Sequence, residues 1–280
     1  MRNRNPITEP RWFQVMLIAI TICFLAGLIF LPVMIVFAEA FKNGIDLFFA
    51  AITNEDAVFS IKLTIFVSLI SVFANLVFGV IASWAIAKFE FSGKYLLITL
   101  IDLPFSISPV VAGLIYIMLY GAQSRLGMWL VNHEINIVFA IPGIILVTTF
   151  TTFPFVAREL IPLMQEQGTE PEEAAILLGA SGWQTFFRVT LPNIKIGLLY
   201  GVLLCNARAM GEFGAVSVIS GHISGMTNTI PLTVEIFYNN YQFQAAFALA
   251  STLTVLALVT LVLKFILDFM GNKANDREAI

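Results

Sequence analysis

Long apolar runs separated by short polar stretches dominate the chain. Six of these runs carry almost no charge, and each is about 20 residues or longer, the length a helix needs to cross a hydrocarbon core of roughly 30 Å. An open sheet cannot satisfy its backbone hydrogen bonds in lipid, so we expect each run to be helical. The predicted fold is an all-α integral membrane protein whose six transmembrane helices cover residues 12–37, 63–87, 98–120, 135–156, 196–220 and 243–263.

Polar or helix-breaking residues interrupt two of the six runs. In a membrane, such residues are tolerated where protein or water surrounds them. We therefore expect these two helices to face the interior of the protein. The interrupting residues are Asp102, Pro104, Ser106, Ser108 and Pro109 in the run at 98–120, and Asn206, Arg208 and Glu212 in the run at 196–220.

The composition agrees with a membrane as the solvent. Hydrophobic residues make up 59% of the chain and the mean hydropathy is +0.89. Charged residues make up 12%, about half the share usual in soluble domains. The sequence has no basic patch with interleaved aromatic residues, so no nucleic acid partner is expected. Cys23 and Cys205 stand alone in apolar runs, and we expect no disulfide, no metal site and no cofactor.

The first run could be mistaken for a cleaved signal peptide because Arg2, Arg4 and Arg11 precede it. The charge-free stretch from Trp12 to Phe37 is much longer than the roughly 7–15 residues of a signal sequence. We therefore expect an uncleaved helix.

The distribution of Lys and Arg predicts the orientation, because short segments rich in these residues stay in the cytoplasm. With the N-terminus inside, eleven of them lie on the inner side and three on the outer side. Both termini and the loop at 158–195 are therefore expected in the cytoplasm. The inner set is Arg2, Arg4, Arg11, Lys88, Lys94, Arg158, Arg188, Lys195, Lys264, Lys273 and Arg277, and the outer set is Lys42, Lys62 and Arg125.

The loop at 158–195, between the fourth and fifth runs, has the pattern of two short helices. The segment Thr169–Glu172 has the spacing of a capping box, which predicts a helix start. Gly179 predicts the end of that helix. A second capping signature at Ser181–Gln184 predicts another helix, expected to end before Leu191–Pro192. Periodicity alone leaves open whether this helix-turn-helix has a partner or is only an amphipathic surface hairpin.

The spacing of residues within the loop resembles the EAA loop of ABC-importer permeases. Glu173, Ala174 and Ala175 are followed by Gly179 and then, after nine residues, by Val189 in place of the usual Ile. The resemblance implies that these four residues, from Glu173 to Gly179, belong to a coupling helix that docks in a cleft of an ATPase subunit. A G-x-x-x-x-G-K-[ST] sequence does not occur. The ATPase is therefore expected to be another chain, and this chain is not expected to be an enzyme or to carry a catalytic residue.

Other segments narrow the resemblance to the substrate group. Residues 102–113 and 208–215 are similar to permeases for sulfate, thiosulfate and molybdate. Residues 217–223, 228–232 and 234–236 resemble the W-type permease subunits of sulfate/thiosulfate importers. The resemblance covers nearly the whole chain and implies a single transmembrane domain over 1–280. It also implies alternating access in a bacterial-type inner membrane, with a T-type permease subunit, an ATPase dimer and a periplasmic sulfate/thiosulfate-binding protein. A molybdate or tungstate importer, or a secondary anion transporter, remains an alternative.

Arg208 and Glu212 are the main candidates for the translocation path. They are four residues apart, so they share a helix face and can pair. Charges inside a membrane normally face a bundle interior or a watery cavity. Arginine also offers planar donors that suit a tetrahedral oxyanion. The alternative is that the pair only neutralises itself and fixes its helix to neighbouring helices.

Four other polar residues bear on the path. Ser106 and Ser108 are candidates to line it, but serine in membrane helices more often packs or bonds to its own helix. His222 is a candidate for contact with the anion or the binding protein, and otherwise a solvated loop residue. Asp102 would repel sulfate, so we expect it to cap a helix or bond to a neighbouring helix.

Overall fold

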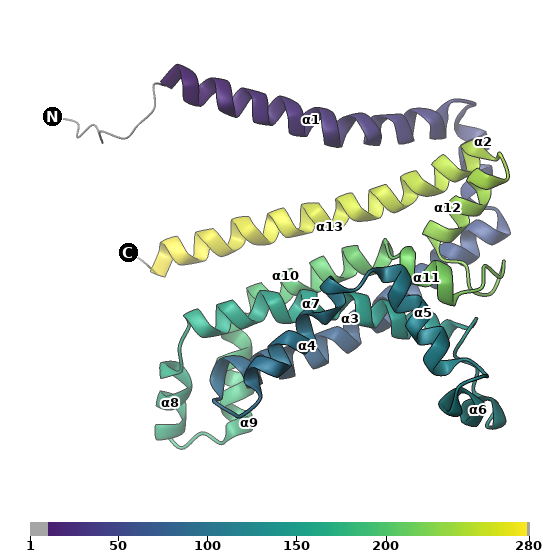
Figure 1. Cartoon of the computed structure of the whole chain (residues 1–280). Helices are drawn as coiled ribbons and strands as arrows, with labels where there is room; N and C mark the ends of the chain where they lie inside the picture. Colours follow the sequence, from purple (N-terminus) through teal and green to yellow (C-terminus); the bar gives the residue numbers. More distant parts are fainter. Residues whose placement is uncertain (1–10, 279–280) are drawn as a thin grey trace.

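The computed structural model describes residues 11–278, which fold almost entirely into α-helices (Figure 1). Arg2 and Arg4, which entered the orientation count, lie outside the described residues. The helices are α1 (Arg11–Phe41), α2 (Ile45–Ile52), α3 (Glu55–Lys88), α4 (Lys94–Ser106), α5 (Pro109–Tyr120), α6 (Arg125–Asn132), α7 (Ile141–Glu166), α8 (Glu170–Leu177), α9 (Gly182–Thr185), α10 (Leu191–Met210), α11 (Gly214–Ile219), α12 (Ile230–Asn239) and α13 (Phe243–Glu278).

The predicted all-α membrane fold is confirmed. Five described helices are long and apolar enough to cross a membrane, and a bent pair, α4 with α5, makes a sixth candidate. The predicted runs overlap these six units, but some bounds differ. The fifth unit runs from Gly182 to Met210 rather than from 196 to 220, because the helix breaks after Met210 and α11 begins only at Gly214. The fourth helix begins at Ile141 rather than at 135, because Phe139 has a φ of 58° and Pro142 occupies the first turn of α7.

The run predicted at 98–120 is not one straight helix. Ile107 and Ser108 have extended backbone angles, and α4 and α5 meet there at a bend of 108°. Pro109 accounts for the position of the break, because the residue before a proline is disfavoured in the helical region. Pro109 then opens α5, where its missing N–H has no cost.

The second loop helix does not end before Leu191–Pro192, so that prediction is wrong. A π-helical turn, Phe186–Thr190, joins α9 to α10, and the helix is continuous from Gly182 to Met210. In the π turn, the Leu191 N–H bonds to the carbonyl of Phe186, five residues earlier. Pro192 therefore lies in the first turn after a widened turn, a place where its missing N–H is tolerated.

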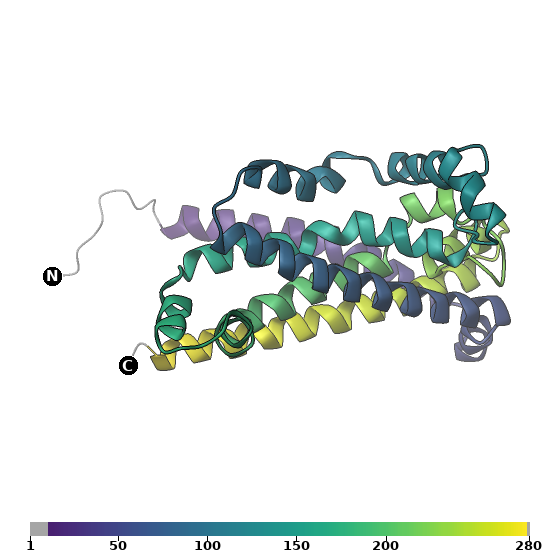
Figure 2. The ribbon, with the colours of Figure 1, turned by 90° about the horizontal axis from the view of Figure 1, so that it is seen from below.

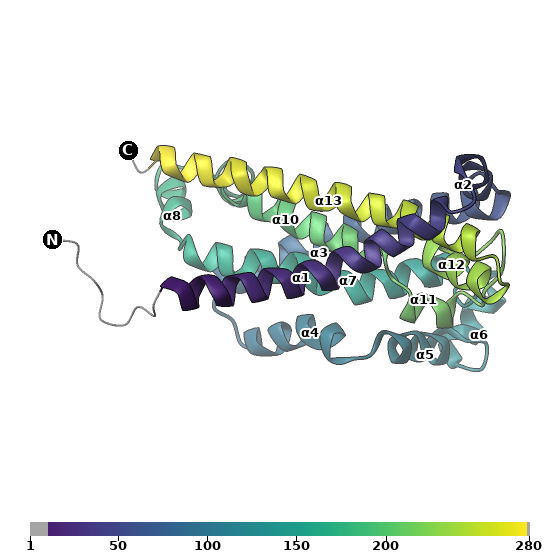
Figure 3. The same cartoon turned by 90° about the horizontal axis from the view of Figure 1, so that it is seen from above.

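The two ends of the bundle carry different elements. Helix α1 begins and α13 ends at the same end as α8 and α9, and we call this the hairpin end (Figure 1). The short helices α2, α6 and α12 lie at the opposite end, and α4 and α5 form one flank while α13 forms the other (Figures 2 and 3). The six-span reading requires this arrangement, because an even number of crossings returns the chain to its starting side.

Helices α3, α7 and α10 form the centre of the bundle and meet at Val156 of α7. A Cβ atom added to Gly79 of α3 would lie 2.8 Å from the Val156 Cβ, and one added to Gly201 of α10 would lie 3.1 Å from the Val156 Cα. Small residues allow helix backbones to approach this closely in a membrane. We call this contact the Val156 crossing.

Candidate functional site

The loop between α7 and α10 folds as a surface hairpin, which we define as residues 169–190. The second capping box is confirmed: the Gln184 N–H donates to the Ser181 hydroxyl, and the Ser181 N–H donates to the Gln184 side chain at 2.9 Å. The first box does not form. Thr169 has ψ near −5° rather than the extended conformation of an N-cap residue. Its hydroxyl instead donates to Glu173 at 2.7 Å.

Glu172 fastens the surface hairpin to the end of α3. Its carboxylate lies 2.9 Å from the Lys88 ammonium and accepts the hydroxyl of Thr190 at 3.0 Å. Lys88 also donates to the carbonyl oxygen of Gly168. Lys88 therefore contacts both Gly168, just before α8, and Glu172, in the first turn of α8. The hairpin is therefore anchored to the bundle by charge-assisted hydrogen bonds.

Gly179 ends α8 in the way the sequence predicts. Its φ is +90°, a value that glycine adopts without the steric cost other residues incur. The N–H groups of Gly179 and Ala180 donate to the carbonyls of Ile176 and Ala175, which is the Schellman arrangement. A Cβ atom at Gly179 would meet nothing within 4 Å, so the requirement for glycine is conformational rather than spatial.

The outer surface of the hairpin is apolar and exposed. Leu177 and Leu178 are 88% and 90% exposed, and Trp183 is 74% exposed and stacks on Phe187. Glu173 and Ala174 are exposed beside this patch, and Ala175 is half-buried. Large exposed apolar side chains that gather in one place are typical of a surface that another protein covers.

Arg208 and Glu212 form an ion pair of 2.7 Å. The pair forms across the end of α10 rather than along one helix face, because α10 stops at Met210. Glu212 also accepts the Thr151 hydroxyl at 3.1 Å and the Ala215 N–H at 3.2 Å, so it links α7, α10 and the start of α11. Glu212 is buried, whereas the Arg208 side chain is 34% exposed.

The two serines lie at the break between α4 and α5, beside the break after α10. Ser106 ends α4, Ser108 precedes α5, and both are exposed. Helix α5 packs against α11, where a Cβ atom on Gly214 would lie 3.2 Å from the Cβ of Pro109. The structure therefore brings the Ser108 region to the segment that contains Glu212. His222 lies beyond α11 in an exposed turn and does not join this group.

Asp102 bonds to another helix, as expected. Its carboxylate accepts from the Arg158 Nε at 2.7 Å, and this ion pair joins α4 to α7. The Arg158 guanidinium also lies 4.6 Å from the centre of the Phe105 ring. From the sequence, Arg158 contributed only to the predicted orientation in the membrane. Its partner is 56 residues away in the sequence, and no local pattern indicates such a pair.

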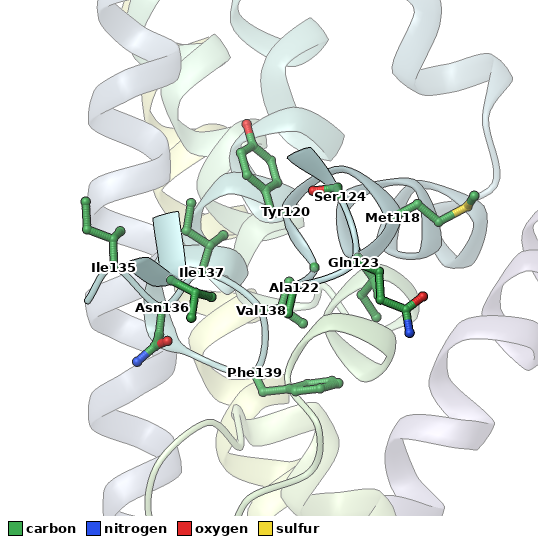
Figure 4. Close-up of a pocket in the computed structure, with 13 residues that line it drawn as sticks. Met118, Tyr120, Ala122, Gln123, Ser124, Ile135, Asn136, Ile137, Val138 and Phe139 are labelled. Carbon is green, nitrogen blue, oxygen red and sulfur yellow. The ribbon is translucent and has the colours of Figure 1, made fainter. Parts of the chain in front are cut away.

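A pocket of about 680 Å³ opens at the end opposite the hairpin (Figure 4). It lies between the end of α5, with the turn that follows, and the segment 135–139 that leads into α7. Tyr120, Ser124 and Phe139 are among its lining residues. None of the residues predicted for the path or for the hairpin lines this pocket.

Comparisons with known proteins give a consistent result. A family model described as binding-protein-dependent transport system inner membrane component matches residues 75–273. The chain is 52% identical over 264 residues to the sulfate transport system permease protein CysW of Synechocystis, covering 94% of this chain and 96% of the relative. It is 33% identical to the sulfate transport system permease protein CysT of Escherichia coli, covering 86% and 87%.

A solved structure shares the fold. It is the crystal structure of a bacterial alginate ABC transporter in complex with a periplasmic protein bound to an alginate pentasaccharide. The TM-score is 0.75 at 18% identity, with 94% of this chain and 95% of that chain covered.

Proposed function

Since this chain belongs to the binding-protein-dependent transport system inner membrane component family, we propose that it is the W-type permease subunit of a sulfate/thiosulfate importer. The observation that carries the proposal is the 52% identity to a CysW permease over nearly the full length of both chains. The chain moves the anion, and a separate ATPase subunit supplies the energy. Residues 1–280 act as one transmembrane domain.

We further propose that the surface hairpin couples this permease to the ATPase. Its apolar surface around Leu177, Leu178 and Trp183 is exposed in the isolated chain, which is costly unless a partner covers it. The Lys88–Glu172 contact and the continuous helix from Gly182 to Met210 supply two connections into the bundle. Glu173, Ala174 and Ala175 form the part of α8 that enters the partner, and Gly179 sets the turn.

The complete importer, in this proposal, contains four kinds of subunit. A T-type permease pairs with this chain, as the similarity to CysT as well as to CysW supports. A dimer of ATPase subunits binds the hairpins, and a periplasmic binding protein delivers the anion. The hairpin end and both termini then face the cytoplasm of a bacterial-type inner membrane.

For the translocation path we propose Arg208 as the principal anion contact. The Arg208 side chain remains partly exposed although it pairs with Glu212. It lies near the end of α10, beside the break between α4 and α5. Ser106 and Ser108 add hydroxyl donors at the neighbouring break. His222 contacts the anion or the binding protein at the outer surface. Glu212 is the resting counter-ion of Arg208 and releases it in one state of the alternating-access cycle.

The test is uptake of radiolabelled sulfate by the complete complex in proteoliposomes that contain ATP. We expect uptake that requires both this chain and ATP and that excess thiosulfate inhibits. Molybdate at the same excess should inhibit far less. Strong inhibition by molybdate with weak inhibition by thiosulfate would assign the importer to molybdate instead, and uptake without the ATPase would indicate a secondary transporter.

A further inference from the structure

Two arginine–carboxylate pairs lie along one face of α7. Thr151 of α7 bonds to Glu212, which holds Arg208. Arg158 is seven residues further along the same helix, so it lies two turns from Thr151, on the same face. Along the axis of α7, Arg158 lies about 10 Å closer to the hairpin end than Thr151 does. The two arginines are therefore arranged in sequence along the direction of transport.

The pair nearer the hairpin end is the more accessible one. The Arg158 side chain is 55% exposed and that of Asp102 is 38% exposed, against 34% for Arg208. Within the described part of the chain, the only hydrogen bond of the Arg158 guanidinium runs from Nε. A two-pronged arginine–carboxylate contact would also use an Nη atom. The Nη groups of Arg158 are therefore available to another acceptor.

The surroundings of Arg158 also favour an oxyanion. Ser106 is four residues after Asp102, so its hydroxyl shares the same side of α4. Phe105 lies against the guanidinium and restricts its orientation without competing for the Nη donors. Helix α7 extends to Glu166, past the predicted loop start at 158, so Arg158 lies within the helix. A charge in a membrane helix normally faces protein or a watery cavity rather than lipid. The exposed side of the pair is thus best explained by a hydrated path.

We propose that Arg158 is a second anion-binding station, located between Arg208 and the cytoplasmic end of the path. Its ligand is a tetrahedral oxyanion such as sulfate, and Asp102 is its counter-ion when the station is empty. This inference rests on the proposed function. Transport favours several weak sites in sequence over one strong site, because an anion must both enter and leave. Asp102 and Glu212 each compete with the anion for the neighbouring arginine and so lower the affinity of both sites for the anion.

A simpler role for the pair would be a strut that holds α4 against α7. A structural contact and an anion-binding site respond differently when both residues of the pair are made neutral. Arg158→Gln combined with Asp102→Asn keeps two hydrogen-bonding side chains of similar size but removes both charges. A strut needs only the bond between the helices, whereas an anion station needs the positive charge.

The experiment measures sulfate uptake and ATP hydrolysis by the same proteoliposomes, and the result is the number of sulfate ions moved per ATP. We expect the neutral pair to assemble and to hydrolyse ATP within about twofold of the unmodified complex, while the ratio falls about tenfold, the effect of losing one strong charged contact. Arg158→Lys should retain more of the ratio than the neutral pair, because it keeps the charge but loses the planar donors.

The control is Lys94→Gln, which removes the Lys94–Glu90 pair at the start of α4, where Glu90 is exposed, and should leave the ratio unchanged. A normal ratio in the neutral pair overturns the proposal. So does a loss of assembly or a parallel loss of ATP hydrolysis and uptake, because a strut explains both. If the unmodified complex moves no sulfate at all, the proposed function itself fails, and this outcome is visible before any variant is compared.

Discussion

Arg208 and Glu212 show how far neighbouring residues in a sequence can predict a contact. A spacing of four residues correctly indicated the ion pair. The same spacing could not indicate that Glu212 would also bond to Thr151 and to the N–H of Ala215, because those contacts depend on where α10 ends. The Arg158–Asp102 pair, formed between two helices, left no local signal.

We expect Arg208→Gln to lower sulfate uptake strongly while assembly with the ATPase remains intact. Arg208→Gln combined with Glu212→Gln should lower it as well, since the charge that meets the anion is still missing. Uptake is measured at matched amounts of protein in the membrane. Full recovery in the double variant would mean that the two charges only compensate each other.

A second residue-scale prediction concerns the turn at Gly179. Gly179→Val forces a β-branched residue into a positive φ, a conformation that costs about 1–3 kcal/mol. We expect the variant to insert into the membrane but to bind the ATPase weakly and to lose most of its uptake. Co-purification with the ATPase measures the first effect directly.

Gly182→Val is the matched control for this prediction. Gly182 belongs to the same hairpin, and a Cβ atom there also meets nothing within 4 Å, but its φ is not positive. This variant should bind the ATPase nearly as well as the unmodified chain. Equal losses in the two variants would mean that bulk at the hairpin, rather than the turn conformation, matters for docking.

At the scale of helices, apolar runs predicted where the chain crosses the membrane, and prolines and turns decided where each helix ends. The runs at 12–37 and 243–263 match α1 and the start of α13. The bends at Ser108 and the late start of α7 depend on local backbone geometry that a hydropathy pattern does not contain. The short helices α2, α6 and α12 were missed because eight to ten residues give too few periods to recognise.

The Val156 crossing yields a prediction about helix packing. Gly79→Leu or Gly201→Leu inserts a side chain where a Cβ atom alone would lie 2.8 Å or 3.1 Å, respectively, from an atom of Val156. Overpacking of this kind typically costs about 1–3 kcal/mol. We expect both variants to lower the temperature at which the purified complex loses its fold in detergent. Gly27→Leu in α1, where a Cβ atom meets nothing within 4 Å, is the control and should have no such effect.

At the scale of the whole molecule, the orientation in the membrane can be tested by labelling. In a chain with Cys23 and Cys205 replaced by serine, a cysteine at Gln165 should react only with a reagent applied from the cytoplasm. A cysteine at Asn240 should react only from outside. Both positions are exposed and lie at opposite ends of the bundle. Reaction from the reverse sides would contradict the proposed orientation and, with it, the position of the ATPase.

The unbroken helix from Gly182 to Met210 has a mechanical consequence. If the Val156 crossing at Gly201 is its fulcrum, the arm that reaches Gly182 is about 28 Å long and the arm that reaches Arg208 about 10 Å, at 1.5 Å per residue. With these arm lengths, a displacement at Gly182 is about three times larger than the displacement it causes at Arg208, and the force at Arg208 is larger by the same factor. A movement of about 3 Å at the hairpin would thus shift Arg208 by about 1 Å, enough to lengthen a 2.7 Å bond beyond the range of a hydrogen bond. In the proposed importer, a movement driven by the ATPase at the hairpin thus breaks one ion pair in the outer half of the bundle with a displacement of only about 1 Å there.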